Sequence, residues 1–172
     1  LLVVGGGFIG LEAAAVAASK GLQVTLLEAA PRILQRVAAP ATSDHFRKLH
    51  RSHGVDIREG ASLRRLLGQG GRVCGAELSG GETLDVDVVL VGIGVDPNVE
   101  LAAQAGLAVD NGIAVDARCR SSDPLILAAG DCCSFDFRGR RIRLESVQNA
   151  NDQAAAAAHT VAGKAAPYVA LP

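Results

Sequence analysis

Several features that are common in other proteins are absent from this sequence of 172 residues. It contains no methionine and no tryptophan, and aromatic residues make up only 3%. No apolar run approaches the ~20 residues of a membrane-spanning helix, and no secretory signal peptide is visible. Because the chain lacks methionine and opens inside an apolar stretch, we expect it to be part of a longer protein, without a membrane span.

Clusters of like charge are also missing. The 17 basic and 18 acidic residues give a net charge of -1, and no basic block stands out. This balance argues against nucleic acid as a partner. Hydrophobic residues make up 49% and charged residues 20%, which indicates a globular protein of one domain, or one and a fraction.

The sequence also lacks the cysteine spacings of metal sites and redox pairs. Its four cysteines are Cys74, Cys119, Cys132 and Cys133. They form no C-x-x-C pair, and adjacent Cys132 and Cys133 are poor disulfide partners because a disulfide needs a specific Cα separation. His50 and His53 lie on the apolar face of an expected helix, which favours packing over metal binding. We therefore expect reduced thiols, a cytoplasmic location and no metal.

The sequence does have a glycine-rich turn at its start. Residues 1–4 are apolar and predict a buried parallel strand, and Gly5, Gly7 and Gly10 follow as G-x-G-x-x-G. A helix of small residues and a second apolar strand come next, and that strand ends in Glu28. The acid stands eighteen residues after the last glycine (28 minus 10), as in βαβ units that bind dinucleotides.

Each part of this unit has a physical role. Gly5 allows the tight turn, Gly7 lets a pyrophosphate approach the backbone, and Gly10 lets the helix pack closely on the strand. The helix N-terminus offers N–H groups and the positive end of its dipole to the phosphates. Glu28 can accept hydrogen bonds from a ribose diol. A glycine turn that binds nothing would explain the glycines but not Glu28.

Two arginines follow in the loop after the second strand. Arg36 could contact the adenine or a phosphate, or it could be a solvated loop residue, and both interpretations stay open. Arg32 could accommodate the 2′-phosphate of NADP, which Glu28 would repel. We therefore expect NAD(H) rather than NADP(H).

The rest of the first half predicts a sheet with an unusual crossover. A helix is expected over 43–53, with Ser43 as N-cap and Gly54 after its end, followed by a short strand over 55–58. Glycine-rich turns then separate three short segments near 61–67, 72–78 and 82–86, which predicts a β-meander. Residues 86–91 predict another buried strand, which ends in Gly92-Ile93-Gly94.

The second half mixes hairpins with single elements. We expect a short helix begun by Asp96 and Pro97, followed by a hairpin over 107–115. A buried strand over 125–129 should lead into Gly130-Asp131. A second hairpin over 135–144 and an alanine-rich helix over 146–162 are expected after it. The predicted fold class is α/β. It is a Rossmann-like parallel sheet with helices on one side and a three-stranded β-meander crossover on the other.

Four stretches carry a resemblance to a known family. They are VGGGFIGLE (4–12), GIGVDPN (92–98), AAGD (128–131) and LESVQNA (144–150). In order and spacing they resemble the FAD-dependent ferredoxin reductases of the putidaredoxin and rubredoxin reductase type, which belong to the pyridine nucleotide–disulfide oxidoreductase class. The similarity runs from residue 1 to about residue 163. The first stretch is a generic motif, and the other three are specific in combination.

The resemblance implies two parts that bind different cofactors. Residues 1–115 would be the NAD(H)-binding domain, inserted in a split FAD-binding domain whose returning part would be 116–172. The implied NAD(H) contacts are Gly5, Gly7, Phe8, Ile9, Gly10, Glu12, Glu28, Arg36, Gly92, Ile93 and Gly94. Glu12 matches an acid near the nicotinamide, although a surface role is the alternative. Gly130 and Asp131 match a turn that meets the flavin chain, and Val147 matches a helix start that faces the flavin ring.

The implied function is electron transfer from NADH through FAD to an iron–sulfur protein such as a ferredoxin or rubredoxin, with no protein acid or base as catalyst. The alternatives are an NADH oxidase, a disulfide reductase or a stand-alone NAD(H)-binding module. A second G-x-G-x-x-G for FAD is absent, so we expect the chain alone to hold no flavin. We also expect copies to pair through an apolar edge over 125–129, as a homo-oligomer.

Overall fold

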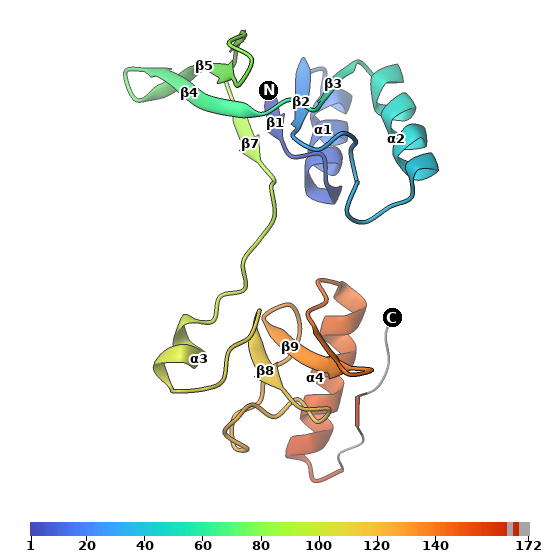
Figure 1. Ribbon diagram of the computed structural model, residues 1–172, viewed down its shortest axis with the longest axis vertical. Helices are drawn as coiled ribbons and strands as arrows, with labels where there is room; N and C mark the ends of the chain where they lie inside the picture. The colour runs from blue at the N-terminus through green and yellow to red at the C-terminus, as the bar shows by residue number, and fades with distance from the viewer. Residues whose placement is uncertain (165–166, 169–172) are drawn as a thin grey trace. The chain divides into compact units, whose positions relative to one another are not determined.

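The computed structural model describes residues 1–164 and 167–168 and shows a mixed α/β chain (Figure 1). Its contacts divide it into two compact units, Leu1–Gly94 and Val95–Pro172. Among the helices of the described part, none is both long and apolar enough to cross a membrane.

The first unit is built on a four-stranded parallel sheet in the order β3-β2-β1-β7. Its strands are β1 (Leu2–Val4), β2 (Val24–Glu28), β3 (Val55–Glu59) and β7 (Val89–Val91). Neighbouring side chains alternate between the faces, so Leu2 and Leu27 join one hydrophobic cluster while Val3 and Leu26 join another. Burial on both faces explains why β1 is wholly apolar and β2 nearly so, whereas the edge strand β3 alternates apolar and charged residues.

Different elements cover the two faces of this sheet (Figure 1). Helices lie on one side, α1 (Phe8–Ser19) and α2 (Pro40–Ser52), and an antiparallel meander lies on the other, β4 (Leu63–Gln69), β5 (Arg72–Leu78) and β6 (Thr83–Asp85). Leu11 and Ala14 of α1 are buried in one cluster, and Ala76 and Leu78 of the meander in the other. The predicted fold class is confirmed, including the meander that connects β3 to β7.

In the described part of the second unit there are a small sheet in the order β10-β9-β8 and two helices. Its elements are α3 (Glu100–Gln104), β8 (Ile113–Val115), β9 (Cys133–Phe137), β10 (Arg140–Ile142) and α4 (Val147–Val161). The predicted hairpin after residue 135 is confirmed, because Arg138 and Gly139 have φ of 50° and 79°, as a two-residue hairpin turn requires. The start of α4 is also confirmed, since Ser146 caps it by accepting a hydrogen bond from the Asn149 N–H.

Residues 125–129 do not form the predicted buried strand. A single bridge joins Leu127 to Arg120, and the Leu125 side chain is 88% exposed. The carboxylate of Asp123 accepts a hydrogen bond from the Leu125 N–H, and this local turn folds the segment back onto residues 119–121, with which it shares two backbone hydrogen bonds and the single bridge. The prediction of an apolar strand edge over 125–129, on which we based self-association, is therefore wrong.

The predicted N-cap of α2 is also wrong. The helix begins at Pro40, with Ala39 as its N-cap, because proline suits the first position of a helix. Ser43 is instead buried in the first turn, and its hydroxyl donates to the Ile33 carbonyl at 2.7 Å. Gly54 has φ of 83° just after the helix end, as predicted.

The short helix α3 starts later than predicted. Asp96 and Pro97 lie outside it, and Val99 is its N-cap, with φ of -120°. Within the described residues the Asp96 carboxylate accepts no hydrogen bond, so nothing caps a helix at that point.

The predicted hairpin over 107–115 is only partly formed. Asn111 and Gly112 have positive φ, and one antiparallel bridge joins Val109 to Ile113. The second arm, β8, pairs in parallel with β9 instead and so belongs to the second unit. The contact boundary therefore falls after Gly94, whereas the division near residue 115 concerns cofactor binding and stays a prediction.

Candidate functional site

Three predicted site segments meet at one edge of the parallel sheet. Strand β1 lies between β2 and β7, and their carboxyl ends lead into Gly5, Glu28 and Gly92 respectively. In open α/β sheets, ligands bind outside the carboxyl ends where the chain connections leave in opposite directions. The topology therefore brings together residues that are up to 87 positions apart (92 minus 5).

The glycines at this edge differ in what a side chain at each position would meet. A Cβ on Gly5, whose φ is 109°, would lie 2.3 Å from the Gly92 carbonyl oxygen, and a Cβ on Gly10 would lie 1.9 Å from the Gly5 carbonyl oxygen. These positions are closed by the protein's own backbone. Gly7 has an ordinary φ of -82°, and a Cβ there would meet no atom within 4 Å. Gly7 therefore borders open space, as expected of a pyrophosphate cradle.

The N-terminus of α1 opens onto the same space. Gly7 is the N-cap, no side chain caps the helix, and its first turn carries no acidic residue. The first N–H groups of the helix are therefore available to an anion, which the helix dipole also favours. Phe8 and Ile9 in that turn are 61% and 59% exposed, and Ile93, just after β7, is 68% exposed. These side chains offer apolar contact area for the planar rings of a ligand.

Glu28 links the glycine turn to the loop that follows β2. One carboxylate oxygen accepts the Gly6 N–H at 2.7 Å, and the other accepts the Ala30 N–H at 2.7 Å. Each oxygen has a further lone pair, so the half-buried carboxylate can still accept a ribose hydroxyl. The two backbone bonds were not predicted, and contact with a ribose stays a prediction.

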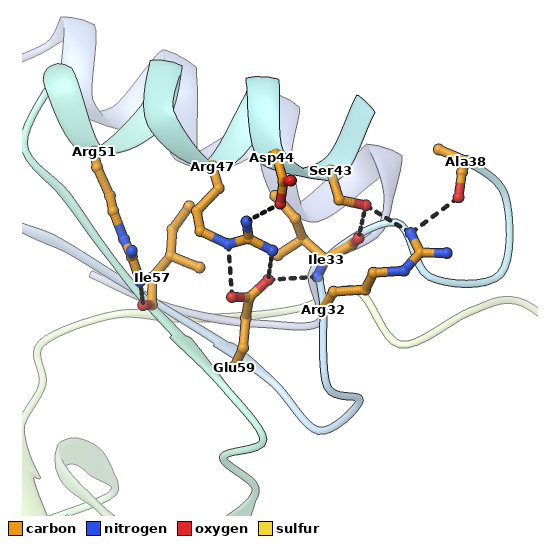
Figure 2. A network of polar contacts seen from close by, with 9 residues as sticks. All are labelled: Arg32, Ile33, Ala38, Ser43, Asp44, Arg47, Arg51, Ile57 and Glu59. Atoms are coloured by element: carbon orange, nitrogen blue, oxygen red, sulfur yellow. Dashed lines mark hydrogen bonds and ion pairs between the residues drawn. The ribbon is translucent and has the colours of Figure 1, made fainter. Parts of the chain in front are cut away.

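The two loop arginines point to different surroundings. The Arg32 guanidinium donates to the carbonyls of Ala38 at 2.9 Å and Gln35 at 3.1 Å and to the Ser43 hydroxyl at 2.6 Å, as Figure 2 shows in part. It is thus engaged inside its own loop and not presented to a 2′-phosphate. Arg36 is exposed and has no hydrogen-bond partner among the described residues, so it is the arginine that a ligand could reach.

Two other predicted contacts lie within two residues of other predicted contacts along the chain and are exposed. Glu12 is exposed on α1, one turn after Phe8, and forms no ion pair within the described residues. Gly94, with φ of 127°, is the last residue of the first unit. Their roles toward a nucleotide stay predictions.

A polar network beside the site was missed by sequence reasoning (Figure 2). Glu59, at the end of β3, accepts the Ile33 N–H at 2.8 Å and two hydrogen bonds from Arg47 at 2.7 and 2.8 Å. The hydrogen bonds from Arg47 lower the pKa of the Glu59 carboxyl below its usual value. One local feature of the sequence could have indicated this network: Glu59 ends β3 as Glu28 ends β2, and the two residues are paired in the sheet register.

In the second unit, the structure brings the Gly130–Asp131 turn to the first turn of α4. Gly130, with φ of 83°, is buried, and a Cβ there would lie 3.3 Å from the Ala150 side chain. Asp131 is exposed, and Val147, the first residue of α4, is 81% exposed. An anion or a planar ring could therefore reach both the turn and the helix N-terminus.

The buried side chain of Gln153 on α4 holds this turn, a role that was not predicted from the sequence. Its side-chain oxygen accepts the Gly130 N–H at 2.8 Å and the Cys133 thiol at 3.2 Å, while its amide nitrogen is buried without a partner in the described structure. Burial raises the pKa of the Cys133 thiol to about 12, so it is not a thiolate nucleophile near neutral pH. Within residues 1–164 and 167–168, no group of three or more metal-ligating side chains is arranged to hold a metal ion.

Comparison with known proteins gives a consistent result over nearly the whole chain. The family model described as pyridine nucleotide-disulphide oxidoreductase matches residues 1–154. The chain is 48% identical over 176 residues to a ferredoxin–NAD(P)(+) reductase of Sphingomonas sp, a match that covers 100% of the chain and 42% of the relative. It is 45% identical over 178 residues to the putidaredoxin reductase of Pseudomonas putida, with coverage of 95% and 40%.

The solved structures agree with the curated relatives. A ferredoxin reductase from Rhodopseudomonas palustris matches with a TM-score of 0.95 and 47% sequence identity, over 99% of this chain and 43% of that one. The chain therefore spans about two fifths of the length of the proteins that it matches.

Proposed function

The chain belongs to the pyridine nucleotide-disulphide oxidoreductase family, and we propose that it is the NAD(H)-binding part of a flavin-dependent ferredoxin reductase. The whole protein would take electrons from NADH and pass them through FAD to an iron–sulfur protein of the ferredoxin or rubredoxin type. The names of its relatives support this proposal over an NADH oxidase, a disulfide reductase or a binding module without chemistry.

One observation carries the nucleotide-binding proposal. Gly7 leaves open space at an uncapped helix N-terminus, and the Glu28 carboxylate is tied by Gly6 to the same turn. A pyrophosphate would lie over Gly7 against the first N–H groups of α1, and the adenosine ribose would bond Glu28. Glu28 would repel a 2′-phosphate, and Arg32 is engaged elsewhere, so we propose NAD(H) as the nucleotide.

The remaining contacts of the proposed NAD(H) site follow from their positions. Exposed Phe8, Ile9 and Ile93 would pack against the dinucleotide, and exposed Arg36 would meet its adenosine end. Glu12 would lie near the nicotinamide. Gly92 and Gly94 would let the backbone after β7 approach the ligand.

The second unit fits part of an FAD site. The buried left-handed Gly130 lets Asp131 project from a tight turn, and the N-terminus of α4 presents Val147 and its N–H groups beside that turn. Bound FAD would supply the redox chemistry, accepting a hydride from NADH and releasing electrons singly. Asp131 would hold the flavin chain, and the α4 N–H groups would stabilise negative charge on the ring. No acid or base of this chain is assigned a catalytic role.

The proposal also covers the division into domains, the pairing of copies and the cellular compartment. We assign residues 1–115 to NAD(H) binding and 116–172 to part of the FAD-binding domain, and we expect the purified chain alone to be colourless. Exposed Leu125, Val147 and Val161 would support pairing of copies of the isolated chain. All four cysteines are free, which supports a reducing, cytoplasmic compartment.

The test is a pair of glycine substitutions. Gly7→Val should weaken NADH binding by at least about 100-fold, because its side chain occupies the cradle, while the far-ultraviolet circular dichroism stays unchanged. Gly80→Val is the matched control, since Gly80 also borders open space and lies in a turn of the meander. It should bind NADH as the wild type does. A folded Gly7→Val chain with normal affinity would place the cradle elsewhere.

A further inference from the structure

The loop after β2 lies directly on the glycine turn. The Leu34 N–H donates to the Gly6 carbonyl at 2.9 Å, and a Cβ on Gly6 would lie 2.7 Å from the Ile33 side chain. The Gly6 N–H donates in turn to Glu28. The backbone of Gly6, next to the open position at Gly7, is therefore fixed on one side by the last residue of β2 and on the other by the segment that follows β2.

Within that segment, both peptide groups of Ile33 are held by side chains. Ile33 is fully buried, its N–H donates to Glu59 at 2.8 Å, and its carbonyl accepts from Ser43 at 2.7 Å. Leu34 has φ of 55°, a left-handed conformation that a leucine rarely adopts. A strained residue of this kind persists only where its surroundings determine it, and here they do so at both peptide groups of Ile33.

Arg47 in turn fixes the direction of Glu59. Its guanidinium donates two hydrogen bonds to that carboxylate, at 2.7 and 2.8 Å, and it also pairs with Asp44 on α2 (Figure 2). The side chains of Arg47 and Glu59 are only 19% and 16% exposed. A bidentate pair of this geometry is more directional than an ordinary surface ion pair.

We propose that Glu59, oriented by Arg47, is a positioning residue for the dinucleotide site. Through Ile33 and Leu34 it sets the place of Gly6 and with it the cradle at Gly7, although it does not itself touch the nucleotide. This inference rests on the proposed function, because the cradle matters only if NAD(H) binds there.

The experiment compares two carboxylates in the full chain. Glu59→Ala should weaken NADH binding about tenfold in titration calorimetry, because the nucleotide must then order a loop that was previously set in advance. Glu77→Ala is the matched control. The Glu77 side chain is 13% exposed and also accepts hydrogen bonds from two arginines, but it lies in β5 and, among the described residues, forms no hydrogen bond or ion pair with the loop. It should change NADH affinity less than twofold.

A conservative variant and a local readout separate positioning from general damage. Glu59→Gln keeps an acceptor for the Ile33 N–H and loses the ion pair with Arg47, so its affinity should fall between those of wild type and Glu59→Ala. Amide hydrogen exchange at Leu34 and Gly6 should become faster in Glu59→Ala and stay unchanged in Glu77→Ala. If Glu59→Ala does not fold, the same two measurements on Glu59→Gln decide the question.

Each outcome has a definite meaning. Normal NADH affinity in a folded Glu59 variant would overturn the positioning role, and so would equal losses in the Glu59 and Glu77 variants. A wild-type chain that fails to bind NADH would overturn the proposed function itself, and the positioning role with it. The two failures are distinguished by the wild-type titration.

Discussion

The two units of this chain bury different kinds of surface. The first has apolar clusters on both faces of a parallel sheet, with fully buried Leu2, Val3 and Leu26 among them. Over its described residues, the second has one small cluster around Val115, Cys133 and Phe135. Along the inner face of its main helix α4, the buried residues are polar: Asn149, Gln153 and Thr160.

These polar side chains of α4 hold loops and do not fill a core. Gln153 accepts the Gly130 N–H, Thr160 donates to the Arg118 carbonyl at 2.9 Å, and Asn149 donates to the backbone of a third loop. The first unit thus derives its order from apolar burial on a regular sheet. In the second unit, the turn that would face a ligand depends on single hydrogen bonds, so each bond should matter individually.

The largest effect should come from opening a cavity in the first unit. Leu26→Ala removes a fully buried side chain and should lower the free energy of unfolding of that unit by about 3 kcal/mol. Far-ultraviolet circular dichroism in urea reports both units, whereas Tyr168, the single tyrosine of a chain without tryptophan, reports the second by fluorescence. Leu125→Ala is the exposed control and should cost little. If the Tyr168 transition shifted by the same amount, the two units would unfold together, and the claim that they are stabilised separately would be wrong.

The next largest effect should come from the carboxylate on which the site of the first unit depends. Glu28→Ala removes acceptors for two backbone N–H groups and for the proposed ribose, a loss of ~1.5–3 kcal/mol. NADH affinity should therefore fall about tenfold to a hundredfold, and the preference over NADPH should narrow. Glu82→Ala, at an exposed carboxylate of the same unit, serves as the control. Equal NADH affinity in wild type and Glu28→Ala would remove Glu28 from the site.

A smaller loss should follow when a single bond is removed from the second unit. Gln153→Leu leaves the Gly130 N–H buried without an acceptor, at a cost of about 1–2 kcal/mol. Tyr168 fluorescence in urea measures that unit directly. Gln148→Leu, at an exposed position of α4, should leave the transition where it is. If both variants were equally stable, apolar contacts and not hydrogen bonds would determine the order of the second unit.

The smallest effect concerns the pH at which each unit weakens. Burial raises the pKa of Cys133 from 9.0 to about 12 and also raises the pKa of Cys119 and Tyr168. A raised pKa means that the folded state holds the proton more tightly, so stability is lost as pH rises above 9 toward 12. The lowered pKa of Glu59 has the opposite sign, and its contribution to the first unit is lost as pH falls below 4.5.

The second unit should accordingly lose about 1 kcal/mol between pH 8 and pH 10, while the first unit should not. Urea unfolding at the two pH values measures the loss, with Tyr168 fluorescence reporting the second unit and circular dichroism reporting both units. In Cys133→Ala the loss should shrink, since the main titrating thiol is gone. Alkaline weakening of the first unit alone would contradict this assignment.

What the sequence predicts well has its cause within a few residues. The glycine turn at Gly5, the hairpin over 135–144 and the start of the last helix near Ser146 each follow from local backbone requirements, and the structure contains all three. The parallel strands and the meander follow from apolar runs separated by glycine-rich turns. Sequence reasoning thus recovers the sheet and its covering layers, and the structure brings three of the predicted site segments to one edge of that sheet.

What the sequence does not predict depends on partners that are distant along the chain. Ser43 has the composition of an N-cap, but its hydroxyl binds Ile33, ten residues earlier, and Glu59 binds the same residue from 26 positions away. The apolar run over 125–129 fails as a strand because Asp123 draws it into a turn. Hydrogen bonds of this kind leave no periodic pattern, so the support of the site was not visible in advance.

The open space beside Gly7 separates two kinds of evolutionary constraint. Any descendant that folds must keep Gly5 and Gly10, because their neighbours are the protein's own backbone. Gly7 has an ordinary φ and no neighbour within 4 Å, so folding alone would tolerate drift to alanine or valine there. A duplicated copy that kept its architecture but was no longer selected for its ligand would therefore be free to lose Gly7 while it kept Gly5 and Gly10. The identity of this one residue distinguishes a lineage maintained for binding from one maintained only as a scaffold.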